Sequence, residues 1–229
     1  MKKTAFVLIV IMMLLAASAS AEERKYRFEF FGQVGYPLEK SFEITAPQSE
    51  TPVPGKHRFT AGGGGGVRFG IDGAKYWGQD YSYSYNANPS KITTPYGSFS
   101  INNRFHQVNS NVLFYPGSLE KKTFFPYLTA GVGVTFVSIT QKTIGEALDP
   151  ARGGIGELQG EVFFAFNAGA GFRWRLNDRW GIRVDARDYM SRPIRYGLPE
   201  SSSDPYEVVF PVSGAFHNLV ASFGIVIHF

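Results

Sequence analysis

The chain has 229 residues, with 23 Lys and Arg, 19 Asp and Glu, and no cysteine. If Lys2 and Lys3 leave with a signal peptide, 21 basic residues remain against 19 acidic ones, which gives no reason to expect a nucleic-acid partner. Disulfides are excluded, and a cysteine-linked lipid anchor is not expected. After the N-terminus no apolar stretch reaches the ~18 residues of a membrane helix, so a helical membrane protein is not expected.

The N-terminal segment predicts export. Lys2 and Lys3 precede an apolar run from Ala5 to Ala17, and the small residues Ala19-Ser20-Ala21 follow. This order is typical of a secretory signal peptide, which we place at residues 1–21 with cleavage after Ala21. The remaining residues, 22–229, suit one barrel domain.

Eight segments of alternating apolar and polar residues predict strands. They lie near residues 25–36, 58–71, 74–86, 105–116, 124–137, 161–176, 179–190 and 216–229. Each is at least as long as the roughly 9 to 11 residues that a tilted strand needs to cross a bilayer.

The links between these segments alternate short and long. Short turns are expected at Asp72-Gly73, at 116–123 and at Asn177-Asp178, since Asx-Gly and Asn-Asp pairs supply the positive φ of tight hairpins. The long links are residues 37–57, 87–104, 138–160 and 191–215, and TIGEALDP in the third predicts a short helix ending before Pro150. Four long loops on one side and short turns on the other are typical of an outer-membrane barrel.

Aromatic residues predict the membrane boundaries. Trp77, Trp174 and Trp180 all fall at the short-turn end of their strands and predict one interfacial girdle. The opposite girdle is expected to contain Tyr36, Phe59, Tyr81, Tyr83, Tyr85 and Phe136.

The last strand, HNLVASFGIVIHF, places six apolar residues on one face and Asn218, Ser222, Gly224 and His228 on the other. Its aromatic end, Phe229, resembles the assembly signal of bacterial outer-membrane β-barrels. With FTAGGGGGVRFGIDGAKYWGQDYSYSY and VFFAFNAGAGFRWRLNDRWGIRVDARDY, it resembles the small eight-stranded barrel family, similar to the transmembrane domain of outer-membrane protein A.

The resemblance implies an all-β, eight-stranded antiparallel up-and-down transmembrane barrel in the outer membrane of a Gram-negative bacterium. It also implies the barrel assembly machinery, outer-membrane lipids and lipopolysaccharide as partners. No module follows Phe229 in this sequence, so the peptidoglycan anchoring of some family members is not expected.

The opposite side of each strand predicts a charged lumen. The inward charges expected to form a structural network are Arg27, Glu29, Arg68, Asp80, Arg173, Arg183, Asp185 and Arg187. Buried ions must be paired, so the three acids should be shared among the arginines. Inward glycines on the neighbouring strands make room for these side chains and favour a plug over a permanent pore. With Arg175, six inward arginines face three acids, a surplus that would favour anions if the plug opened.

These observations favour a non-enzymatic structural or surface-interaction protein, with long loops that could bind an extracellular ligand. One alternative is a small gated channel for small solutes. Another is an outer-membrane lipid hydrolase, because His106 and Ser110 share the lipid-facing side of one strand. Their i, i+4 spacing separates them by roughly 13 Å, too far for a Ser–His hydrogen bond. Neither a metal site nor a cofactor is expected.

Overall fold

The computed structural model describes residues 25–44, 53–94, 97–117, 119, 123–140, 158–201 and 209–229. Its strands are β1 (Lys25–Pro37), β2 (Lys40–Ile44), β3 (Val53–Phe59), β4 (Gly62–Ala74), β5 (Trp77–Thr94), β6 (Gly97–Phe114), β7 (Phe124–Ile139), β8 (Glu161–Arg175), β9 (Trp180–Ser191) and β10 (Phe216–His228). The expected signal peptide and the expected helix at TIGEALDP lie outside the described residues.

Within the described ranges, no helix has the length and apolar character needed to span a membrane.

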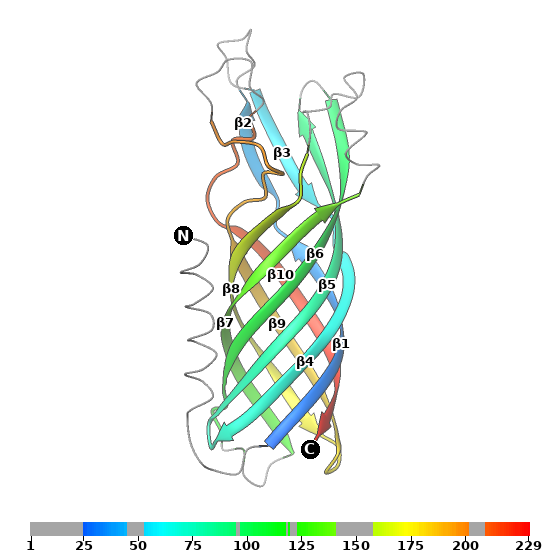
Figure 1. The fold of residues 1–229 in the computed structure, drawn as a ribbon, viewed down its shortest axis with the longest axis vertical. Helices are drawn as coiled ribbons and strands as arrows, with labels where there is room; N and C mark the ends of the chain where they lie inside the picture. Colours follow the sequence, from blue (N-terminus) through cyan, green and yellow to red (C-terminus); the bar gives the residue numbers. More distant parts are fainter. Residues whose placement is uncertain are drawn as a thin grey trace.

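Eight of the strands close into a barrel, which confirms the predicted fold class. Neighbours pair antiparallel in the order β1, β4, β5, β6, β7, β8, β9 and β10, and β10 returns to β1 (Figure 1). The closing pair runs in unbroken register from Arg27 opposite His228 to Pro37 opposite Asn218. Closure leaves no free edge in the barrel wall, because every strand there has two partners.

The two ends of the barrel differ. At the turn end, short connections join β4 to β5, β6 to β7 and β8 to β9. At the extended end, the 18-residue strands β5 and β6 rise beyond the wall, and the β2–β3 hairpin pairs with β5 beside them (Figure 1). The links expected at 37–57 and 87–104 are therefore largely strand where they are described. The strand expected at 58–71 is in fact divided between β3 and β4.

The turns differ from the prediction in detail. Asp72 and Gly73 belong to β4, with a register irregularity beside them, and the chain reverses at Lys75–Tyr76. The reversal at Asn177 lies where expected, but without positive φ. Instead the Asn177 side chain accepts hydrogen bonds from the backbone N–H groups of Arg179 and Trp180, at 2.9 and 2.8 Å, as in an Asx-turn.

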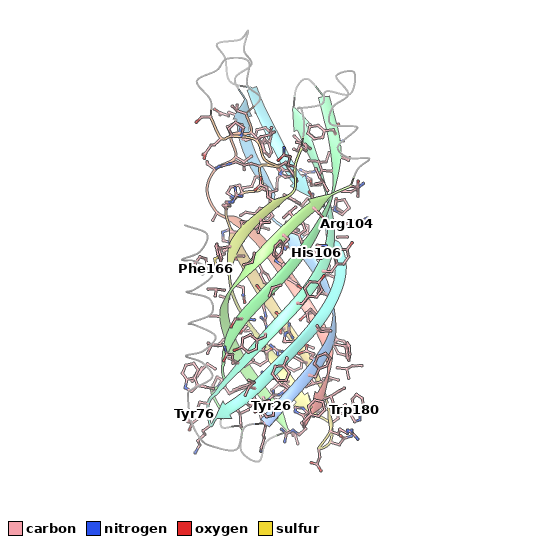
Figure 2. The ribbon with its side chains drawn as sticks, viewed as in Figure 1. Tyr26, Tyr76, Arg104, His106, Phe166 and Trp180 are labelled. Atoms are coloured by element: carbon pink, nitrogen blue, oxygen red, sulfur yellow. The ribbon has the colours of Figure 1, made fainter. Side chains whose placement is uncertain are left out.

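The outer surface is apolar, and its aromatic residues mark both ends. Trp77, Trp174 and Trp180 are exposed at the turn end, where Figure 2 also labels Tyr26 and Tyr76. Towards the other end, Tyr36, Tyr83, Tyr85 and Phe136 face outward as expected. Tyr81 also faces outward, but it is only four residues from Trp77 and so lies nearer the turn end than expected. Phe59 was expected with them, but it is buried, because the β3 hairpin turns that residue towards the axis.

Candidate functional site: the barrel lumen

A small ionic group, the lower group, lies inside the barrel at the turn end. Asp72 forms ion pairs with Arg27 and with Arg173, whose Nη2 lies 2.8 Å from Asp72 Oδ2. The Tyr115 hydroxyl donates to Asp72 Oδ1 at 3.1 Å. The Arg173 guanidinium also lies 5.1 Å from the Phe125 ring centre, within range of a cation–π contact.

A larger ionic group, the central network, fills the next level. Its charged members are Glu29, Arg68, Asp80, Arg183, Asp185 and Arg187, all buried. Arg183 lies at its centre, with Nη1 at 2.9 Å from Asp80 Oδ2 and 3.4 Å from Glu29 Oε2, and Nε at 3.1 Å from Asp185 Oδ2. The structure thus places all eight predicted network residues in the lumen, Arg27 and Arg173 in the lower group and six in the central network.

Hydrogen bonds from neutral side chains satisfy the acids further. Asn111 donates to Asp80 at 2.9 Å, and Tyr127 and Ser222 each donate to Asp185 at 2.9 Å. Arg68 is held by Glu29 at 2.7 Å and lies 4.4 Å above the Phe31 ring. These ion pairs and hydrogen bonds offset the desolvation of the buried charges, since each unpaired buried ion would lower the free energy of unfolding by several kcal/mol.

Sequence reasoning missed Asp72, Tyr115 and Tyr127. Asp72 is a fourth inward acid, so the expected surplus of positive charge is smaller than six against three. Its inward position follows from the alternation already used for Arg68 and Gly70, and the Asp-Gly turn signal concealed it. Tyr115 and Tyr127 continue the inward alternation of their strands, where aromatic residues were assigned only to the girdles.

Glycines provide the space for these long side chains. A Cβ at Gly70 would meet the Arg27 guanidinium, and one at Gly224 would meet the Glu29 carboxylate. In β8, a Cβ at Gly169 would lie 2.9 Å from Arg187 Cγ. The lumen is thus filled by side chains from one strand lying over glycines of the next.

Uncharged amides form the level above the central network. Gln107, Asn109, Asn167 and Asn218 are buried there. Among the described residues, neither side-chain polar atom of Asn109 or of Asn167 has a hydrogen-bond partner. This level is polar without ionic pairing, so it separates the charged part of the lumen from the part above it.

An apolar cluster, the apolar cap, lies inside the extended end. Its members are Phe42, Phe59, Ile92, Phe99, Ile101, Phe105, Val137, Leu158, Phe163, Ile194, Tyr196, Phe210, Val212 and Phe216. They come from β2, β3, β5 and β6, from the extended-end parts of β7, β8 and β10, from Leu158, and from the segment between β9 and β10, which lies beside β2 in Figure 1. Along the axis, the interior therefore changes from ionic to amide to apolar.

A buried polar cluster holds the segment between β9 and β10 inside the apolar cap through hydrogen bonds. His57 Nε2 lies 3.0 Å from Ser90 Oγ and 3.1 Å from the Tyr196 hydroxyl. Tyr196 has φ of 57°, which is costly for a residue with a Cβ, and it is fully buried. Glu161 holds the turn by accepting the backbone N–H groups of Arg195 and Gly197 at 2.9 and 3.0 Å.

The Ser–His arrangement considered for a hydrolase does not form at His106 and Ser110. His106 Nδ1 lies 2.9 Å from the Tyr83 hydroxyl, and Ser110 accepts a hydrogen bond from Gln79 at 3.4 Å. Among the described residues, a Ser–His hydrogen bond joins Ser90 and His57, which are both buried, and no described carboxylate bonds to this imidazole. The described residues also hold no group of three or more His, Asp or Glu suited to a metal ion.

Comparison with known proteins agrees with this geometry. The family described as "Outer membrane protein beta-barrel domain" matches residues 6–206. The chain belongs to this family. The closed barrel is thus an outer-membrane barrel of bacterial type, with the turn end on the periplasmic side and the extended end outside the cell.

Solved structures resemble this outer-membrane barrel in fold. OprG from Pseudomonas aeruginosa is 15% identical, with a TM-score of 0.59 over 92% of this chain and 98% of that one. Ail of Yersinia pestis, solved with the heparin analogue sucrose octasulfate, is 10% identical, with a TM-score of 0.44 over 91% and 99%. AlkL is 14% identical, with a TM-score of 0.47 over 93% of each chain. No curated protein matches the sequence.

Burial of His57 predicts that the stability of the outer-membrane barrel depends on pH. Ile92, opposite His57, lies 15 residues beyond Trp77, about 50 Å along a tilted strand and so past the ~25 Å apolar band. Burial lowers the pKa of His57 from 6.5 to about 3. Between these two pKa values, His57 is protonated in the unfolded chain but not in the folded protein. The free energy of unfolding should therefore fall as the pH decreases from about 6.5, by up to about 1.4 kcal/mol per pH unit.

Urea unfolding of the reconstituted protein at several pH values measures this effect. The His57→Gln variant is the matched control, because glutamine can still bond Ser90 and Tyr196 but does not titrate. We expect a steeper loss of stability on acidification in the wild type than in His57→Gln. Parallel pH profiles would show that His57 is not the group responsible.

Proposed function

We propose that this chain is a sealed, non-enzymatic outer-membrane barrel that serves as a structural and surface-interaction protein. The observation that supports the proposal is the filling of the barrel interior by side chains at successive levels, in the central network and in the apolar cap. An eight-stranded barrel has an interior only wide enough for side chains to fill, so each level is a complete barrier.

The extended end supplies the interaction surface. β5, β6 and the β2–β3 hairpin form a paired sheet beyond the barrel wall, where the connecting segments can meet an extracellular ligand. At the other end, Phe229 is 72% exposed and its backbone N–H donates to Tyr26 at 3.0 Å. That exposure suits Phe229 as the assembly signal for the barrel assembly machinery.

Conductance in planar bilayers tests the sealed state. The wild type is expected to give no stable open channel. Two barriers in series also predict that a network variant, Asp80→Ala/Arg183→Ala, and a cap variant, Tyr196→Ala/Phe210→Ala, each stay closed, whereas the variant combining all four changes conducts.

Two results would contradict the sealed barrel. A stable wild-type channel would show that the levels do not close the lumen. Conductance from the cap variant alone would favour the gated channel, with the loop segment as its gate and the central network as a permeable filter. The folding of each variant should be checked by its gel shift on heating, because conductance reports on the lumen only if the barrel is folded.

A further inference from the structure

The lipid-facing wall carries a groove of about 550 Å³ across β6, β7 and β8. Its lining includes Ser110 and Val132, which are partly buried, and Phe164 and Phe166 of β8, which are 51% and 62% exposed. β6, β7 and β8 are paired along this whole stretch, from Val108 opposite Val134 to Phe166 opposite Val132. The groove therefore lies on the outside of the wall, within the apolar band, where lipid chains reach it.

The headgroup level lies directly above this groove. Along the outer face of β6, apolar residues give way to His106, which pairs with Tyr83 and faces Phe136, and then to Arg104. Figure 2 shows His106 and Arg104 one above the other on the upper wall, far from Trp180 at the turn end. Arg104 is exposed, and among the described residues no acid forms an ion pair with it.

We propose that this face binds one lipid of the outer leaflet, a phosphorylated glycolipid of the lipid A class. Arg104 contacts its phosphate, and one of its acyl chains lies in the groove. An arginine matches a phosphate with paired N–H donors, and an exposed one at the membrane surface attracts an anionic headgroup. Successive outward positions on a strand are about 6.6 Å apart, so Val108 lies about 13 Å below Arg104, a distance that an acyl chain spans.

The position of the cation decides which lipid fits. Arg104 is ten residues from Phe114 at the turn end, so its level is the extracellular leaflet. The belt formed by Tyr83, His106 and Phe136 lies between Arg104 and the groove, where interfacial rings are expected. A glycolipid with phosphate above and acyl chains below meets all three features at once. This proposal does not depend on whether the lumen conducts.

Native mass spectrometry of the barrel released from nanodiscs tests the proposal. The nanodiscs hold phosphatidylcholine with a minor share of diphosphoryl lipid A, and parallel samples hold phosphatidylglycerol at the same phosphate content. We expect retained lipid A on the wild type, about fivefold less on Arg104→Gln, which corresponds to about 1 kcal/mol for one basic residue, and a similar loss on Val132→Phe.

Two control variants make the same kinds of substitution at positions away from Arg104 and the groove. Arg179→Gln removes an exposed cation at the turn end, and Ala221→Phe adds the same ring to the lipid face of β10. Both should retain lipid A like the wild type, and a heat-dependent gel shift confirms folding of all four. Undiminished retention by Arg104→Gln and Val132→Phe would overturn the proposal. So would equal retention of phosphatidylglycerol, or a dimer that only Val132→Phe abolishes, which would make a second copy the occupant.

Discussion

Replacing Asp80 with leucine should lower the free energy of unfolding by about 3–5 kcal/mol, the cost of removing one partner from a buried ion pair. Asp80 is completely buried, and its carboxylate faces Arg183 at 2.9 Å and accepts the amide of Asn111. Arg187 Nη2 also lies near this carboxylate, 3.8 Å from Asp80 Oδ2. Arg68 Nε also lies 4.0 Å from Asp80, so the substitution takes a buried acid from three arginines that no solvent reaches.

Urea unfolding from lipid vesicles measures this loss. Asp178→Leu, at the exposed turn between β8 and β9, is the control and should be close to neutral. The double variant Asp80→Leu/Arg183→Met removes one charge of each sign and leaves Glu29 with Arg68 and Asp185 with Arg187. It should be more stable than Asp80→Leu alone. A neutral Asp80→Leu would mean that the network does not stabilise the barrel.

Alanine at Gly64 should cost about 2 kcal/mol or more, whereas alanine at Gly63 should be nearly neutral. A Cβ at Gly64 would meet the carbonyl oxygen of Tyr85 and lie 2.7 Å from the Asn86 Cα, and this backbone is fixed by strand pairing. Overpacking of this kind costs about 1–3 kcal/mol in ordinary cores. At Gly63 a Cβ has nothing within 4 Å, because the residue faces outward.

The two neighbouring glycines therefore form a matched pair. Folding yield from the gel shift and the urea midpoint should separate Gly64→Ala from Gly63→Ala. Alanine also reduces the conformational freedom of the unfolded chain, which favours both variants slightly and cancels in the comparison. Equal effects at the two positions would show that space inside β4 is not what requires glycine.

The central network could be predicted from sequence because a closed barrel keeps one side of each strand inside along its whole length. Strand alternation therefore places the side chains of Arg68 and Arg183 in the lumen. Asp72 shows the limit of this approach. Strand alternation predicts that its side chain faces the lumen, but the Asp-Gly pair suggested that the strand had already ended in a turn. Pairing of Lys25 with Asp72 extends β4 past that signal, and the chain reverses at Lys75–Tyr76.

The apolar cap could not be predicted in the same way. Strand alternation continues past Pro89, which lies on the outer face, so Ile92 and Ile101 enter the cap although residues 87–104 were predicted to be a long link. Phe210 and Tyr196 enter it from a segment without strand structure, where no periodicity indicates which side chains are buried. Only tertiary contact between distant segments decides their place.

The ordering of the interior from ionic to amide to apolar gives the two ends opposite responses to temperature. Burial of apolar side chains stabilises less on cooling, which weakens the cap. Desolvation of the charges in the central network costs less on heating, so that level gains relative strength as the temperature rises. We therefore expect cooling to weaken the apolar cap before it weakens the central network.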